Sequence, residues 1–595
     1  MSVNISPLNL VRVIDPRTDV NARAHREYGV LDGAGDISFK TLPSNNFNNS
    51  TVSFIANPPN ERVYVSRRAY VEMTFELTFT GTCPLGTTLI QAQGMASAPG
   101  VSPGAQTYDA PRAYPMSQIT SSCSVRIGND NISSNVQSYF RALTRYQNST
   151  ANQDGEFSLT PSMLDQYQQL PDGDGFNRNP LAGYGDNVAQ CPRGSFWGAR
   201  ITANPVSDGV TPITATVSLR VVEPIYLSPF LFGTHEGNEQ AFIGIQTLQL
   251  EYTLNGRGNG QVPGVNKNIV GLIGGLWSHS DASPSVFSSA SANLTTATSY
   301  WQYLSPDITQ PIPRITNYSL YEPNYYPTTN AGVVPAGITT TLQTNTIQLK
   351  SIPNRIYCWV SQRDQDINIT SSDCYWSINQ VQVSFDNRDS LLSNASSYDL
   401  YQMALRAGFN GSYVQWSDKC GAVMCLQFGL DVPLTALQAP GLRGNWSFQI
   451  QVQCTNITGQ AETPTLSLLV INEGVMTIDN ITVMRSIGVL SSADVLATKD
   501  MPPVPFRASL NVYGGGFWDS VKSFVSKIAR PALNVAKAIL PSIAPQFAPL
   551  LGAVDDIASA HGVGMARLAR ARKKQQAKGG AMITRAQLED MMGRG

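Results

Sequence analysis

Alternation of apolar and polar residues is the strongest local pattern in the chain. From Val71 to Phe79, every second residue is apolar and the residues between are Glu or Thr. Successive side chains of a β-strand point to opposite faces, so this pattern predicts a half-buried strand. The same period recurs from Ile119 to Ile127. Further strand-like apolar runs centre on Ile356, Val381, Val423, Phe448, Leu466 and Ile481.

The strand pattern occurs twice in the same order. TVSFIANPPNERVYV from Thr51 returns as TIQLKSIPNRIYCWV from Thr346. SVRIGNDN with the following YFRAL, from Ser124, returns as QVSFDNRD with the following YQMAL, from Gln382. Each of these second segments predicts a strand, a polar turn and a short helix, and the helix of the later copy is expected to end at Gly408.

A third, looser correspondence completes the series. SLRVVEPIYL and FIGIQTLQL, from Ser218 and Phe242, match CLQFGLDVPL and FQIQVQC, from Cys425 and Phe448. The repeat is longer than the units of solenoid proteins, which span about 20 to 50 residues. Each copy is therefore predicted to be a complete domain.

Many short strands, frequent turn residues and few helical segments predict an all-β fold. Long connections between strands favour two tandem jelly-roll β-sandwiches over simple meanders. The expected parts are an N-terminal arm (1–36), a first jelly roll (37–256), a linker (257–269), a second jelly roll (270–510), an amphipathic helical segment (511–563) and a basic tail (564–595).

The tail begins with an amphipathic pattern after three glycines. Apolar residues follow the three-and-four spacing of a helix, with lysines set among the polar positions. These apolar residues are Phe517, Trp518, Val521, Phe524, Val525 and Ile528. Such a helix suits the interface of a membrane, and the prolines from Pro531 to Pro549 argue against a straight span. Residues 517–540 are thus a candidate membrane-active helix; the alternative is a helix that packs on a protein partner.

Charge is scarce in the chain but concentrated near its end. Charged residues make up 14% of the sequence, against about 25% in ordinary soluble proteins. Residues 511–595 carry 12 Lys and Arg against 5 Asp and Glu. A group of these cations comprises Arg567, Arg570, Arg572, Lys573, Lys574 and Lys578. They could neutralise nucleic-acid phosphates without sequence preference, or simply form a solvated tail.

Cysteine spacing and the start of the chain indicate an intracellular origin. The eight cysteines form no C-x-x-C motif, and the segment MSVNISPLNLVRVIDPRT lacks the apolar core of a signal peptide. We expect reduced, mostly buried thiols and no secretion by a signal peptide.

Short motifs that resemble catalytic or ligand-binding sites lack features that those sites require. GVSPG at 100–104 matches G-x-S-x-G, but Pro103 has no N–H for an oxyanion hole. GRGNG at 256–260 is followed by a proline instead of a helix, so it does not fit a dinucleotide-binding motif. In PDGDGFN at 171–177 the glycine is two positions too early for a calcium loop, and the closing Glu is missing. The four histidines are far apart. No catalytic, cofactor or metal site is predicted, and a hydrolase would have to assemble its site from distant residues.

Several blocks of sequence resemble double jelly-roll major capsid proteins. They include NPPNERVYVSRRAYVEMTFELTF, AYPMSQITSSCSVRIGNDN, LSPFLFG and SINQVQVSFDNRDSLL. The similarity is to virophages and polinton-like viruses, within the lineage of tectiviruses and adenovirus hexons, and covers most of residues 5–490. The resemblance implies a virion protein of a DNA virus that forms pseudo-hexameric homotrimers in an icosahedral shell.

The same resemblance implies partners and placements. Neighbouring capsomers would pack on the jelly-roll flanks, and minor capsid and penton proteins would join them. The loops expected at 147–210 and 260–345 would lie outside the shell, and the arm and the tail, with its potential genome contact, would lie inside.

The segment GGGFWDSVKSFVSKIARPALNVAKAI also resembles the membrane-lytic internal proteins of adenovirus-like viruses. Those are separate chains released by cleavage near Gly-Gly, whereas here the segment is fused to the capsid-like part. Gly514, Gly515 and Gly516 are therefore a candidate processing site. The alternative to a capsid protein is a two-domain β-sandwich protein for adhesion or carbohydrate binding, with a membrane-associating tail.

Overall fold

The computed structural model describes residues 36–147, 199–230, 241–256, 272–305 and 315–495, with short gaps, and the backbone of two strands nearer the N-terminus. Those two strands, β1 (Leu8–Ile14) and β2 (His25–Leu31), pair antiparallel in the segment predicted to be an N-terminal arm. Residues 34–501 form one compact unit.

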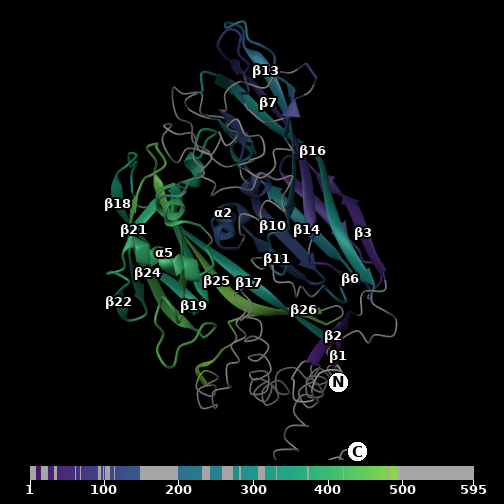
Figure 1. The fold of residues 1–595 in the computed structure, drawn as a ribbon, viewed down its shortest axis with the longest axis vertical. Helices are drawn as coiled ribbons and strands as arrows, with labels where there is room; N and C mark the ends of the chain where they lie inside the picture. The colour runs from purple at the N-terminus through teal and green to yellow at the C-terminus, as the bar shows by residue number, and fades with distance from the viewer. Residues whose placement is uncertain are drawn as a thin grey trace, which may run out of the picture. The chain divides into compact units, whose positions relative to one another are not determined.

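The first sandwich consists of a five-stranded and a seven-stranded sheet (Figure 1). The five-stranded sheet has the order β11-β10-β14-β5-β4 and the larger one β3-β16-β7-β13-β12-β8. Strand β6 also pairs with β16. The bounds are β3 Asp36–Pro43, β4 Asn46–Phe47, β5 Thr51–Ala56, β6 Tyr64–Val65, β7 Tyr70–Thr82, β8 Ala96–Ser97, β10 Thr120–Ile127, β11 Asp130–Ser134, β12 Ala199–Ala203, β13 Ile213–Pro224, β14 Leu248–Leu254 and β16 Val286–Ser305.

The second sandwich has two sheets of the same plan. One has the order β17-β25-β20-β23, with β26 also on β25, and the other β18-β24-β21-β22, with β19 also on β24. The bounds are β17 Ile315–Thr328, β18 Thr339–Gln343, β19 Ile347–Ser351, β20 Arg355–Gln362, β21 Ser377–Phe385, β22 Arg388–Leu391, β23 Val423–Gln427, β24 Arg443–Thr455, β25 Pro464–Asp479 and β26 Thr482–Ile487.

Helices are short and few among the described residues. They are α1 (Pro115–Ile119), α2 (Val136–Gln147), α4 (Leu272–Leu276), α5 (Ser397–Arg406), a 3-10 turn η3 (Asp364–Asp366) and a π-helical turn η4 (Gln415–Lys419). A two-stranded pairing joins β9 (Asp109–Pro111) to β15 (Trp277–His279). Helix α5 begins with a capping box formed by Ser396 and Asp399, and Gly408 follows its end with a φ of 108°.

The two sandwiches share one topology, which confirms the double jelly roll. Along the chain, the series β5, β7, β10, β11, α2, β13, β14, β16 matches the series β19, β20, β21, β22, α5, β23, β24, β25. Neighbours within the sheets match as well, since β3-β16-β7-β13 corresponds to β17-β25-β20-β23 and β11-β10-β14-β5 to β22-β21-β24-β19. The second and third sequence correspondences fall on such matched pairs, and the first matches β5 with β19 and the short strand β6, which precedes β7, with β20.

The predicted division between the copies, however, lies too early in the chain. Strand β16, which the sequence boundaries assigned to the second jelly roll, pairs with β7 and closes the first one. Strand β17 then opens the second copy as β3 opens the first. The junction between the sheets therefore falls between Ser305 and Ile315, not at 257–269. The segment of β16 is rich in Ser and Thr, because the outer face of the strand is polar and only alternate residues are apolar. In the sequence, such a composition is typical of a loop.

The same observation corrects the expected external loop at 260–345. Residues 286–305 and 315–328 are long strands inside the two sandwiches, and α4 and β15 precede them. In the other expected loop, 147–210, α2 ends at Gln147 and β12 covers Ala199–Ala203, while residues 148–198 lie outside the described part.

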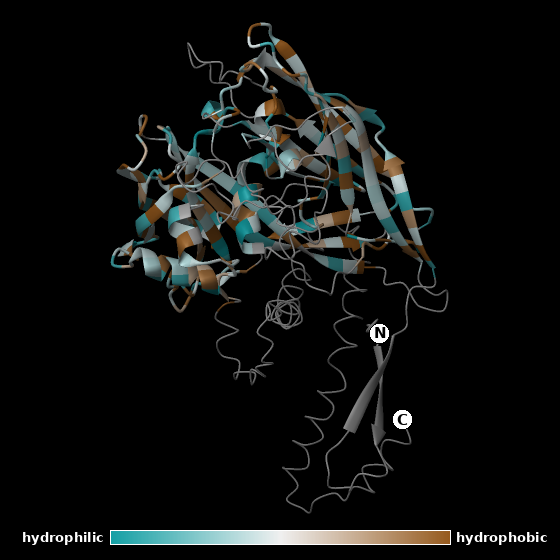
Figure 2. Ribbon diagram, turned by 45° about the horizontal axis from the view of Figure 1, so that its top comes forward, coloured by the Kyte–Doolittle hydropathy of each residue, from teal (hydrophilic) through white to brown (hydrophobic). Residues whose placement is uncertain are grey.

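Alternating burial builds two hydrophobic cores. In β7 the residues from Val71 to Phe79 predicted to face inward are all fully buried. Hydrophobic and hydrophilic segments alternate along the long strands in Figure 2. The six described cysteines, Cys83, Cys123, Cys358, Cys374, Cys425 and Cys454, are buried free thiols.

One sheet departs from this alternation. In β20 the five residues from Ile356 to Val360 are all buried, and β23 and β25 each carry similar unbroken buried runs. A strand has such an unbroken run of buried residues only when both faces of its sheet are covered. The matching sheet of the first jelly roll keeps alternating burial, so its outer face is not covered in the same manner.

Candidate functional site

The junction between the two jelly rolls is built around helix α2. Val136 and Phe140 of α2 belong to the core of the first jelly roll, whereas Tyr139, Leu143 and Tyr146 belong to the core of the second. Figure 1 shows α2 between the strands of the two copies. Residues 139–146 are all buried. Each large apolar side chain buried in this way contributes about 1.5 to 3 kcal/mol.

Helix α2 covers the outer face of the second jelly roll's sheet. The ring of Tyr146 lies 5.2 Å from that of Tyr357 on β20, and its hydroxyl donates to the carbonyl of Val423 on β23. Arg145 donates to the carbonyl of Gly421 and lies over the rings of Tyr375 and Phe409 at 5.8 Å and 5.3 Å. These contacts explain why both faces of β20 are buried.

The turn whose carbonyl accepts a hydrogen bond from Arg145 requires glycine at position 421. Gly421 has a φ of 79°, and a Cβ at this position would lie 2.0 Å from the carbonyl oxygen of Tyr375. The backbone can approach this closely only without a side chain. The carbonyl of Gly421 is thereby held where the guanidinium of α2 can reach it.

Arg112 joins the two copies through backbone carbonyls. Its side chain is fully buried, and Nε donates to Gly274 at 2.6 Å. Nη1 donates to Ser371 at 3.1 Å, and Nη2 donates to Asn368 at 2.7 Å. A buried guanidinium is stable only when its donors are satisfied, so both chain segments are needed to hold it.

Beside Arg112, a buried carboxylate organises a second set of contacts. Asp109 Oδ1 accepts from Trp277 Nε1 at 3.1 Å and lies 2.8 Å from His279 Nδ1, and its Oδ2 accepts from the backbone of Gln91. The backbone N–H of His279 donates to the carbonyl of Ile369 in the second jelly roll. The histidine therefore has a structural role at the junction.

Strand β26 adds a third contact between the copies. Asn129 Oδ1 accepts from the backbone of Val483 at 2.9 Å, and Arg485 pairs with Asp130 at 2.6 Å. Asn129 lies in the turn between β10 and β11, and Asp130 is the first residue of β11; both belong to the GNDN segment of the sequence repeat.

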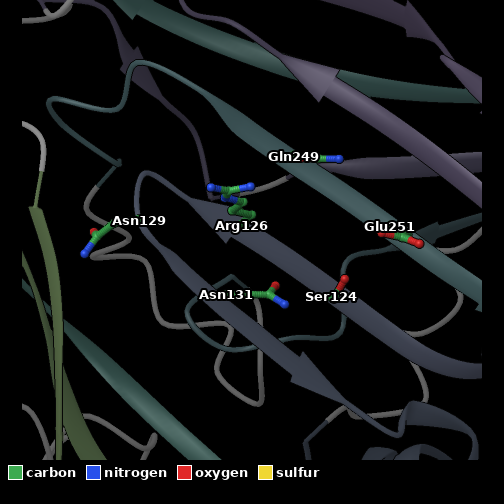
Figure 3. Close-up of a pocket in the computed structure, with 6 residues that line it drawn as sticks. All are labelled: Ser124, Arg126, Asn129, Asn131, Gln249 and Glu251. Atoms are coloured by element: carbon green, nitrogen blue, oxygen red, sulfur yellow. The ribbon is translucent and has the colours of Figure 1, made fainter.

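An open hollow of about 350 Å³ lies beside this turn (Figure 3). Its lining is polar throughout and consists of Ser124, Arg126, Asn129, Asn131, Gln249 and Glu251. Ligand pockets are mostly apolar with a few placed polar groups, so this hollow has the character of a hydrated surface. Within the described ranges, no group of three or more His, Cys, Asp or Glu residues could hold a metal ion.

Two fully buried glutamates carry raised pKa values. Burial raises the pKa of Glu223 to about 7, against the opposing effect of hydrogen bonds from Ser117 and Met116. Burial likewise raises the pKa of Glu462 to about 7, although Trp376 Nε1 donates to it at 3.0 Å. Glu223 accepts hydrogen bonds from the backbone of α1, and α1 packs against α2. The protonation state of Glu223 therefore affects the stability of the junction.

The functional residues predicted from the sequence lie elsewhere in the chain. The apolar helix residues 517–528, the glycines 514–516 and the cations 567–578 are all outside the described residues. Of the helices that the structure describes, none is long and apolar enough to cross a bilayer. The junction was not predicted from the sequence. The sequence repeat nevertheless includes YFRAL, which is the part of α2 that lies at the junction.

Family models match both halves of the chain. The model of the Sputnik virophage major capsid protein first domain matches residues 7–261, and that of the major capsid protein V20 C-terminal domain matches residues 322–474. Together these cover more than half of the chain. The chain belongs to the virophage major capsid proteins.

Individual relatives of this capsid protein agree with the family models. The putative capsid protein V20 of Sputnik virophage is 27% identical over 632 residues, covering 99% of both chains. The cryo-EM structure of the Sputnik virophage matches with a TM-score of 0.69 and 26% identity, over 86% of this chain and 100% of that chain.

A more distant structure shows the fold alone. The mavirus major capsid protein is 12% identical and matches with a TM-score of 0.60, over 78% of this chain and 92% of that chain. The comparisons thus decide between the functions that the sequence left open, in favour of the capsid protein over the adhesion protein.

Replacing Arg112 tests the junction of the capsid protein. Lysine keeps the charge but cannot reach three separate carbonyls with a planar fork, so Arg112→Lys should lower the free energy of unfolding by about 2 to 4 kcal/mol. Chemical unfolding followed by tryptophan fluorescence measures this. The exposed Arg200 provides the control, since Arg200→Lys should change stability by less than about 0.5 kcal/mol. Equal effects of the two substitutions would contradict the assigned role.

The buried glutamates predict a pH dependence. A carboxyl group whose folded pKa is above its unfolded pKa stabilises the fold fully at low pH, and this stabilisation is lost as pH rises through about 7. The capsid protein should therefore have a higher Tm at pH 5 than at pH 8. Glu223→Gln, which stays neutral, should reduce that difference by several degrees in scanning calorimetry. A Tm difference unchanged by the substitution would show that Glu223 does not titrate in this range.

Proposed function

We propose that this capsid protein assembles as a homotrimer with pseudo-sixfold outline and that these capsomers tile an icosahedral shell around the genome. The observation that supports this most directly is the shared topology of the two jelly rolls. Three chains with two equivalent domains each place six similar domains around one threefold axis. Such a ring needs only closed, symmetric contacts between identical chains, which is the usual basis of protein oligomers.

The outer face of the first jelly roll's larger sheet suits contact with another copy of the chain. The outward positions of β7 and β13 are mainly Thr, Ser and Glu, with Glu72 and Arg220 paired by two hydrogen bonds of 2.7 Å and 2.8 Å. Sparse and locally paired charge limits repulsion between copies. We place the protein in the virion, assembled inside the host cell with minor capsid and penton proteins as partners, and assign it no enzymatic activity.

Size and symmetry of the purified full chain test the assembly. Light scattering coupled to size-exclusion chromatography should give three times the 64.4 kDa of one chain. Class averages from electron microscopy should show a hexagonal outline with threefold symmetry. A protein that stays monomeric or dimeric at micromolar to millimolar concentration would rule out the trimeric capsomer.

The C-terminal region supports a second part of the proposal. The amphipathic pattern at 517–540 is proposed to act on host membranes after cleavage near Gly514 to Gly516, and the cations at 567–578 to contact the genome. The sequence pattern supports this part, as does the resemblance of the segment to the membrane-lytic internal proteins of adenovirus-like viruses, which are separate chains.

Cleavage and membrane action are tested separately. Intact-mass measurement of virions should show a fragment ending near Gly516 if the chain is processed, whereas the full 64.4 kDa chain alone would exclude processing. A peptide of residues 516–563 should release dye from anionic vesicles. Replacing Phe517, Phe524 and Ile528 by Ser should abolish release, because the apolar face drives insertion. Intact vesicles with the unmodified peptide would contradict membrane action.

A further inference from the structure

We infer that helix α5 of one copy packs on the outer face of the first jelly roll's seven-stranded sheet in the next copy, as α2 packs on the second jelly roll within one chain. This inference rests on the proposed trimer and names the surfaces that form it. Three features of the chain support it: the contact inside the chain, the equivalent sheet face that is left open, and the equivalent helix that is left half exposed.

The contact inside the chain provides the template. Tyr357 of β20 faces outward and contacts Tyr146 of α2, and across the sheet it is in register with Leu469 of β25 and Tyr325 of β17. Trp359, two residues further along β20, lies 6.1 Å from Tyr325. An aromatic outer face is thus covered by the helix that follows β11.

The equivalent face of the first jelly roll is also apolar but is open. Tyr64 of β6 is in register with Leu304 of β16 and Ile37 of β3, which repeats the register of Tyr357, Leu469 and Tyr325. Ile37 is 50% exposed and its outward neighbour on β3, Phe39, is 78% exposed. Tyr70 and Tyr300 lie opposite each other on the same face and are half-buried. We call Ile37, Phe39, Tyr64, Tyr70 and Tyr300 the sheet patch.

The equivalent helix is exposed where α2 is buried. Helix α5 follows β22 as α2 follows β11, and its Leu400 and Ala404 are buried in its own core. On its other side, Tyr398 is 56% and Leu405 36% exposed, and Leu430 in an adjacent turn is also exposed. Tyr398 and Leu405 are seven residues apart, so they lie on one face of the helix. We call these three residues the helix patch.

The two patches cannot satisfy each other within one chain. In Figure 1, α5 lies to the left of α2 and β3 lies at the right edge of the molecule. A contact between the helix patch of one copy and the sheet patch of another is head-to-tail, and such contacts close into a ring when the rotation is that of the symmetry axis. In the proposed trimer, three such contacts between chains alternate with the three contacts inside the chains around the threefold axis.

The charged groups beside the two patches are already paired. Glu72 and Arg220 lie beside Tyr300 on the sheet, and the Tyr300 hydroxyl donates to Glu72 at 2.7 Å. Arg406 of α5 is held by Asp431 at 2.9 Å on the helix side. Both charged pairs are already formed within each copy, so an interface between the patches would bury no lone charge there.

Substitutions that place a carboxylate in either patch test the inference. In the full chain, Leu405→Glu and Phe39→Glu should each raise the concentration for half-dissociation of the trimer at least tenfold in analytical ultracentrifugation. Leu85→Glu is the matched control, since Leu85 is exposed at the opposite end of β7 from Tyr70, and it should leave the trimer unchanged.

A charge exchange separates loss of contact from loss of folding. The double variant Leu405→Glu with Phe39→Lys should recover trimers, because each helix patch then meets a lysine of the neighbouring copy. Trimers of wild-type strength in both single variants would overturn this interface and leave the trimer itself standing. A wild-type protein that never forms trimers would overturn both.

The chain's own N-terminal segment is the other candidate occupant of the sheet patch. Hydrogen exchange of β3 distinguishes it from a second copy. Protection of β3 should fall in Leu405→Glu and should persist after deletion of residues 1–33. Protection lost on that deletion, and unaffected by Leu405→Glu, would assign the patch to the segment and overturn the inference.

Discussion

The insertion of α2 into the outer face of the second jelly roll is the contact on which the arrangement of the two copies depends. A sheet buried on both faces is unusual in an antiparallel sandwich, where one face commonly meets water. Here the continuous apolar runs of β20, β23 and β25 require a cover, and α2 supplies the tyrosines and Leu143 that provide it. Without that cover, the second jelly roll would expose an aromatic surface large enough to aggregate.

Polar groups then fix the register of this contact. Apolar packing alone tolerates sliding, whereas Arg112 satisfies its donors only when Gly274, Asn368 and Ser371 present their carbonyls together. The glycine at 421 has the same function at the C-terminal end of α2, since its carbonyl accepts a hydrogen bond from Arg145 in a turn that admits no Cβ. Burying such donors unpaired would cost more than the contacts gain, so the two copies have one mutual position.

The fold could be predicted from the sequence because its information is local and repeated. Period-two alternation in β7 and β10, and the repeated turn and helix after β10 and β21, predict a tandem jelly roll from the sequence alone. The boundary was missed because β16 has Ser, Thr and Ala at most positions, which resemble a loop in composition. Only its pairing with β3 and β7, which are more than 200 residues away in the chain, assigns it to the first sheet.

The junction could not be predicted for a different reason. Arg112, Asp109 and Gly421 have no motif, since their partners are backbone carbonyls and N–H groups that come together only in the folded chain. What the sequence did contain was the equivalence of YFRAL and YQMAL, which lie in two helices at the same topological place. Helix α2 is buried on both sides, and α5 is buried on one side only. Two domains of the same topology have equivalent surfaces, and a surface that is covered in one domain but bare in the other indicates where another molecule completes the pattern. In this protein the bare surfaces are one sheet and one helix, which is the complementary pair that a closed ring of identical chains requires.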